Sequence, residues 1–93
     1  MEAIRMLIHD LHHFVALARE RNFALAAQAC NVTRAAVVTS ICDLEKYLEA
    51  PLIATQSSPI TLTAHGEKAL SWARKIIDEY EMMQADLCGA RRQ

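Results

Sequence analysis

The middle of this sequence has very little positive charge. No Lys or Arg occurs between Lys46 and Lys68, and residues 23–49 carry two cations against three acidic side chains. The formal net charge of the whole chain is −1. A chain with this balance has no strong nonspecific attraction to polyanions. If it binds nucleic acid, that binding must rely mainly on shape and on a few specific contacts.

Other absences narrow the class of protein further. No apolar run approaches the ~20 residues that span a bilayer, and the first residues lack the continuous apolar segment of a signal peptide. The three cysteines are widely spaced and form no CxxC motif, which argues against a zinc site or a disulfide framework. We therefore expect a cytoplasmic protein without a metal or other cofactor.

The residues that are abundant favour helices. The chain has 93 residues, of which 53% are hydrophobic, and only two Gly and two Pro interrupt it. Ala and Leu, both strong helix formers, are frequent. This length and composition predict one small, mainly α-helical domain with a core of its own.

Three helices are predicted in the first half of the chain from apolar residues at helical spacing. The first covers roughly residues 3–19. Asn22 is expected to cap the second helix, and Thr33 to cap the third, over about residues 34–50. We expect Val32, in the short turn between the last two helices, to be buried. This layout is a helix–turn–helix.

The third helix has two different faces. An apolar stripe is predicted to face the core, and it consists of Val37, Ile41, Leu44 and Leu48. The opposite side is predicted to face solvent or a ligand, and it consists of Arg34, Ala35, Val38, Thr39 and Cys42.

Beyond Pro51, which closes the third helix, the local pattern changes from helix to strand. Residues 52–55 and 60–62 are two short β-prone runs around a polar turn. They predict a small hairpin, the wing of a winged helix. Thr63 is then expected to cap a last helix over about residues 64–87.

Apolar residues in this last helix recur at alternating steps of four and three, which is a heptad seam. Such a seam predicts pairing between two chains, although it could also cover the rest of its own domain. The predicted dimer interface consists of Ala69, Ala73, Ile76, Tyr80, Met83 and Leu87. We accordingly divide the chain into a winged domain at 1–63, a dimerisation helix at 64–88 and a frayed tail at 89–93.

One set of residues, spread from Leu11 to Gly66, fits a known pattern without a gap. It consists of Leu11, Phe14, Asn22, Phe23, Ala26, Ala27, Val32, Thr33, Ala36, Val37, Ile41, Leu44, Glu45, Leu48, Pro51, Leu52, Ile53, Leu62, Thr63 and Gly66. On these residues the sequence resembles the N-terminal DNA-binding domain of LysR-type transcriptional regulators. The resemblance implies a winged helix–turn–helix, with a three-helix core and a β-hairpin wing, followed by a long C-terminal dimerisation helix.

The departures from that family concentrate on the face expected to meet DNA. The family commonly has Gln where this chain has Arg34, and Ser where it has Val38. At Glu49 the family usually has Gly, which ends the helix. Positions at which the family carries basic or amide residues are neutral here, namely Thr39, Ser40, Thr55, Ser58 and Thr61.

The resemblance predicts a sequence-specific regulator that binds double-stranded operator DNA as a homodimer, with the third helix in the major groove. Arg34 is expected to pair with guanine O6 and N7, while Val38 and Ala35 touch thymine methyl groups. Asn22 is expected to hold a phosphate. The full set of expected DNA-binding residues is Asn22, Thr33, Arg34, Ala35, Val38, Thr39, Cys42, Thr55, Ser57 and Ser58.

Two other functions are compatible with a small helical domain, a protein-interaction module and an enzyme. The neutral third helix would also suit a degenerate winged-helix module that pairs with another regulator and binds DNA weakly or not at all. An enzyme is not expected, because no acid–base pair, nucleophile arrangement or phosphate-binding loop is present.

His9, His12 and His13 have a spacing that could hold a metal, but we expect them to face solvent. No small-molecule effector site is expected in this chain.

Overall fold

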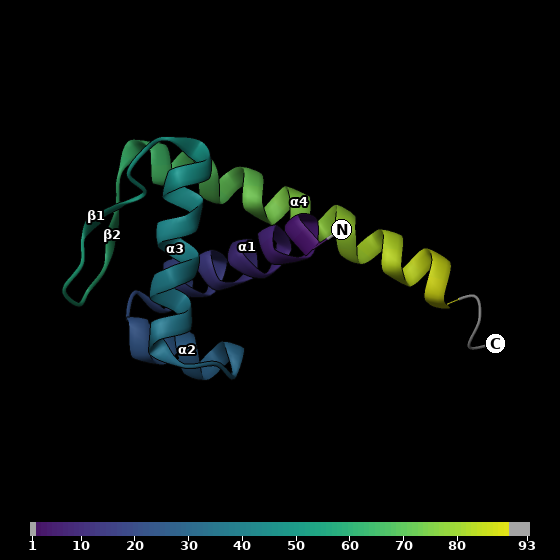
Figure 1. Ribbon diagram of the computed structural model, residues 1–93, viewed down its shortest axis with the longest axis horizontal. Coiled ribbons are helices and arrows are strands. Elements are labelled where there is room, and N and C mark those ends of the chain that lie inside the picture. Colours follow the sequence, from purple (N-terminus) through teal and green to yellow (C-terminus); the bar gives the residue numbers. More distant parts are fainter. Residues whose placement is uncertain (1, 90–93) are drawn as a thin grey trace.

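The computed structural model describes residues 2–89, which form four helices and a two-stranded antiparallel hairpin (Figure 1). The helices are α1 (Glu2–Glu20), α2 (Phe23–Cys30), α3 (Arg34–Leu48) and α4 (Ala64–Gly89), and the strands are β1 (Ile53–Thr55) and β2 (Thr61–Leu62). The predicted winged helix–turn–helix with a long C-terminal helix is confirmed. Of the predicted frayed tail, residues 90–93 lie outside the described part of the chain.

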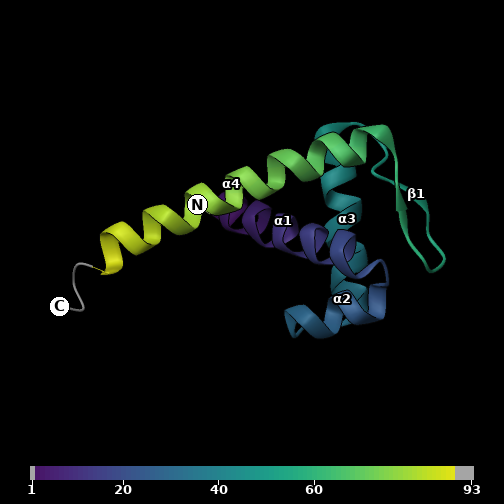
Figure 2. The same cartoon turned by 180° about the vertical axis from the view of Figure 1, so that it is seen from behind.

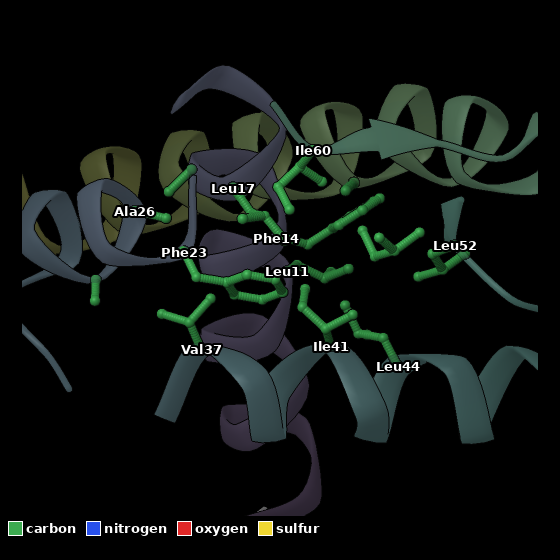
Figure 3. Packing of buried hydrophobic residues seen from close by; sticks show 14 of the residues in the cluster. Leu11, Phe14, Leu17, Phe23, Ala26, Val37, Ile41, Leu44, Leu52 and Ile60 are labelled. Atoms are coloured by element: carbon green, nitrogen blue, oxygen red, sulfur yellow. The ribbon is translucent and has the colours of Figure 1, made fainter. Parts of the chain in front are cut away.

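The hydrophobic core lies where α1 meets the other helices. Phe14 and Leu17 of α1 are completely buried, and Figure 3 shows them surrounded by side chains from the other elements. These surrounding residues include Phe23, Ala26, Val37, Ile41, Leu44, Leu52, Ile60, Ala73 and Ile77. Burial of each large apolar side chain stabilises the fold by about 1.5–3 kcal/mol.

Only the first half of α4 covers the domain. Ala73 and Ile77 belong to the core, whereas side chains from 78 to 88 are exposed except for the half-buried Tyr80. Figure 2 shows α4 continuing well past the other helices. Within residues 2–89, no helix combines the length and apolar character needed to cross a membrane.

Several details of the predicted helices were wrong. Val32 is 36% exposed, so it does not plug the turn. Leu48 is 51% exposed, and the buried stripe of α3 therefore ends at Leu44. The third helix stops at Leu48 rather than near Ala50, and the reason lies in the residue that follows.

Glu49 ends α3 by adopting the left-handed conformation, with φ at 53° and ψ at 42°. Its backbone N–H donates to the carbonyl of Glu45, and the N–H of Ala50 donates to the same oxygen at 3.2 Å. Glycine reaches this conformation without strain, whereas a residue with a Cβ is penalised by roughly 1–2 kcal/mol. Glu49 therefore ends α3 in a backbone conformation that Gly adopts more easily.

We predict that Glu49→Gly stabilises the protein, because Gly removes the Cβ strain at this position. The expected gain is about 1 kcal/mol, which raises the melting temperature of a domain of this size by about 4–8 °C. Thermal unfolding followed by circular dichroism measures it. Glu49→Ala is the matched control, since it removes the same charge but keeps a Cβ. An equal gain from both variants would mean that loss of the charge, not backbone strain, is responsible.

Candidate DNA interface

Side chains cap the first turns of both α2 and α3. Asn22 Oδ1 accepts a hydrogen bond from Leu25 N at 2.9 Å, and Thr33 Oγ1 accepts one from Ala36 N at 3.1 Å. Asn31 ends α2 in the left-handed conformation, with φ at 60°. The two predicted caps are confirmed, and the turn between α2 and α3 is bounded by Asn31 and Thr33.

The outer face of α3 is exposed and almost uncharged. Ala35, Val38, Thr39 and Cys42 are all exposed, as expected from the pattern. Arg34 is also exposed, and its guanidinium carbon lies 5.7 Å from the centroid of the Phe23 ring. This cation–π contact restricts Arg34 while leaving its N–H groups available.

The wing is held against the start of α2. Asn22 Nδ2 donates a hydrogen bond to Ser58 Oγ at 2.9 Å, while Thr55 and Ser57 are exposed along the hairpin. The peptide bond between Ser58 and Pro59 is cis. Both ends of the Asn22 amide are therefore engaged within the protein, and a phosphate here would meet the free backbone N–H groups at the start of α2.

Sequence reasoning missed Arg21 as a member of this surface. Its carbonyl accepts a hydrogen bond from Ile60 N at 2.9 Å, and its Nη1 donates to the carbonyl of Ile60 at 3.3 Å. Arg21 is exposed and so brings a cation to the base of the wing. No local pattern predicts this placement, because the contact joins residues 39 positions apart.

Ser40 does not lie on the outer face of α3, although the comparison with the family grouped it with Thr39 on the face expected to meet DNA. It is 5% exposed and faces α1, where its Oγ lies 2.7 Å from His13 Nδ1. Asp10, which is 7% exposed, also hydrogen-bonds to Ser40. One buried hydroxyl on α3 thus joins two titratable groups on α1.

Burial shifts the pKa values of these two groups in opposite directions. Desolvation raises the pKa of the Asp10 carboxyl above its ordinary value of 3.8, although the hydrogen bond from Ser40 lowers it in part. Desolvation also lowers the pKa of His13 below 6.5, although the nearby Asp10 carboxylate opposes the shift. In both cases burial disfavours the charged form.

The expectation that His9, His12 and His13 all face solvent is wrong for two of them. His9 is exposed, His12 is half-buried, and His13 is hydrogen-bonded to Ser40. Among residues 2–89 no group of three or more His, Cys, Asp or Glu side chains is placed so that it could hold a metal ion.

The predicted dimer residues also separate. Ala73 is fully buried in the core of its own chain, and Ala69 and Tyr80 are half-buried. Ile76 and Met83 are 42% and 51% exposed. Leu87, also predicted, is 62% exposed, and Trp72 and Met82 are further large apolar residues of α4 that are exposed.

An apolar hollow of about 480 Å³ lies where α1, α3 and α4 meet. Exposed Trp72 and Ile76 of α4 line it together with Tyr47 and Leu48 at the end of α3. The exposed apolar residues of α4 therefore continue into a depression on the winged domain.

Comparison with known proteins gives one consistent result. The model of the family described as "Bacterial regulatory helix-turn-helix protein, lysR family" matches residues 8–67. The SDS degradation transcriptional activation protein of Pseudomonas sp. (strain ATCC 19151) is 41% identical over 71 residues, which are 76% of this chain and 23% of that protein. The probable cat1 operon transcriptional activator of Acinetobacter lwoffii is 35% identical over 80 residues, 86% of this chain and 26% of that protein.

Solved structures agree with these matches. Vibrio fischeri DarR, solved in complex with DNA, superimposes with a TM-score of 0.83 at 30% identity, over 91% of this chain and 29% of that one. A CbnR_DBD–DNA complex superimposes with a TM-score of 0.79 at 29% identity, over 92% of this chain and 98% of that one. The present chain spans about a quarter of the length of the curated relatives it matches.

We predict that the protein loses stability as the pH falls from about 7 through the folded-state pKa of His13, which lies below 6.5. His13 has a pKa below 6.5 in the folded state, so the unfolded chain takes up this proton more readily. The stability that neutral His13 contributes is present above pH 6.5 and is lost as the pH falls through the pKa of His13 in the folded state. The raised pKa of Asp10 acts in the opposite direction, because the folded protein takes up a proton on this carboxyl more readily than the unfolded chain does.

Melting temperature measured across this pH range tests the prediction. His13→Asn should reduce the dependence on pH, while His12→Asn, a substitution on the neighbouring residue, should leave it intact. An undiminished dependence in His13→Asn would show that other groups cause the loss.

Proposed function

Because the chain belongs to the LysR family of bacterial helix–turn–helix regulators, we propose that it is the sequence-specific DNA-binding part of a transcription regulator that acts as a dimer. The observation that carries this proposal is the exposed outer face of α3, flanked by the wing, in a fold that superimposes on DNA complexes. We also propose that it acts in the cytoplasm and has no enzymatic activity of its own.

α3 is proposed to enter the major groove, which is wide enough to admit a helix. Arg34 lies in its first turn, and its guanidinium has two parallel N–H donors for guanine O6 and N7. The stacking on Phe23 restricts this side chain before DNA arrives, so less conformational entropy is lost on binding.

The backbone contacts are proposed to be few. Arg21, Arg34 and Lys46 are the cations between residues 21 and 63. Thr33, Thr55, Ser57 and Ser58 supply only neutral hydroxyl donors to phosphate. A dimer with so few cations releases few counterions from DNA, and its affinity falls less steeply with salt than that of a protein with many phosphate contacts.

Dimerisation is proposed to use a revised set of α4 residues. Ala73 is unavailable, and the exposed apolar stripe instead consists of Trp72, Ile76, Met83 and Leu87. Lys68 and Lys75 flank the first half of this stripe, whereas Glu79 and Asp86 flank the second half at helical spacing. This division of charge favours an antiparallel arrangement, in which the basic half of one helix faces the acidic half of the other.

Selection from a pool of random duplex DNA tests the DNA-reading proposal. We expect a palindromic motif whose affinity falls with salt at a logarithmic slope no steeper than about −4, since Arg21 and Lys46 give a dimer four cations for phosphate at about 0.9 each. Arg34→Ala should weaken binding roughly ten- to hundredfold through the lost guanine contact. Arg74→Ala, which removes an exposed cation from α4, is the matched control. No enrichment at low salt from a folded dimer would reject the proposal and favour a protein-interaction module.

Charge placed on the α4 stripe should separate the dimer. We expect Ile76→Glu and Met83→Glu to shift the protein to monomer in sedimentation experiments, because both place a carboxylate in an apolar contact. Met82→Glu is the control, since Met82 is 64% exposed and lies off the stripe. Separation caused equally by all three variants would mean that added charge, and not the stripe, is responsible.

A further inference from the structure

The outer face of α3 presents methyl groups where a DNA reader usually presents polar groups. Val38 is the large apolar residue of this face, with 39% of its surface exposed. Ala35, one turn earlier, and Thr39, beside it, are exposed as well. Neither Val38 nor Ala35 has a side-chain donor or acceptor.

An exposed valine gains little from its position in the free protein. It is a poorer helix former than alanine, and its surface remains in water. Against most base edges in the major groove it would leave donors or acceptors without a partner, which is unfavourable. The C5-methyl group of a pyrimidine is the one apolar group that these edges display.

We propose that Val38, with Ala35 beside it, is a specificity-determining residue that recognises the C5-methyl group of a pyrimidine. This inference rests on the proposed function, because it requires α3 to lie in the major groove. Thymine and 5-methylcytosine carry this methyl group at the same ring position. Binding therefore responds to the methylation of cytosine as well as to the presence of thymine.

The position of Arg34 predicts where the methyl-bearing base lies. Residues four apart are neighbours on a helix surface, and their separation along the axis is about 6 Å. Base pairs are stacked at about 3.4 Å, so the two side chains reach bases within about two steps of each other. The recognised sequence therefore holds a guanine and a methyl-bearing pyrimidine within that distance.

Two selections test the inference with random duplex pools that differ only in containing thymine or uracil. At the enriched position, four duplexes then compare uracil with thymine and cytosine with 5-methylcytosine. Each methyl group should increase affinity about fourfold, as expected for burial of one such group. In Val38→Ala both ratios should fall below about twofold. Val32→Ala should keep them, since Val32 is similarly exposed at 36% but lies in the turn rather than on this face.

The outcomes separate the two levels of the proposal. Equal affinity for thymine and uracil at every position of an enriched motif would reject methyl recognition while leaving DNA binding established. An effect of thymine over uracil without one of 5-methylcytosine over cytosine would also reject the methyl group as the shared ligand. Methyl ratios that persist in Val38→Ala would overturn the assignment to Val38. Enrichment in neither pool would reject the proposed function itself.

Discussion

Every element of this molecule depends on the burial of Phe14 and Leu17 on α1. Both side chains are completely enclosed, and α1 is the helix that contacts α2, α3 and α4. α3 has few contacts of its own with the wing, so its packing against α1 determines its orientation. The exposed outer face of α3, unlike the capping residues Asn22 and Thr33, has no part in this packing, and its residues can change while the scaffold stays constant.

Much of the fold could be predicted because local rules determine it. Apolar spacing gave the four helices, the caps at Asn22 and Thr33 were correct, and the hairpin followed from its turn residues. The errors arose where a local pattern has more than one solution. Glu49 lies within the helix predicted over residues 34–50, yet it takes the left-handed conformation. The chain turns there toward Leu52, whose N–H donates to Glu45 Oε2 at 2.9 Å. Val32 fitted a buried plug by position alone, although neighbouring side chains leave it exposed.

The candidate interface was less predictable than the fold, since it assembles residues that are distant in sequence. Helical spacing was sufficient to place Ala35, Val38, Thr39 and Cys42 on the outside of α3. Helical spacing does not predict the hydrogen bond from the Asn22 amide to Ser58 or the one from Arg21 to Ile60. It also does not predict that Ser40 faces the interior and contacts His13. Likewise, a heptad pattern does not distinguish a residue buried in its own chain, such as Ala73, from one available to a partner.

The contact between Arg34 and Phe23 links base preference to folding through a single ring. Phe23 is only 8% exposed and belongs to the core, yet its ring also supports the guanidinium of Arg34 on the outside. A substitution at Phe23 that the interior tolerates, such as a leucine, would release Arg34 from its stacked position. Under the proposed function, drift in the interior would therefore change which DNA sequences are preferred, without any mutation at Arg34 itself.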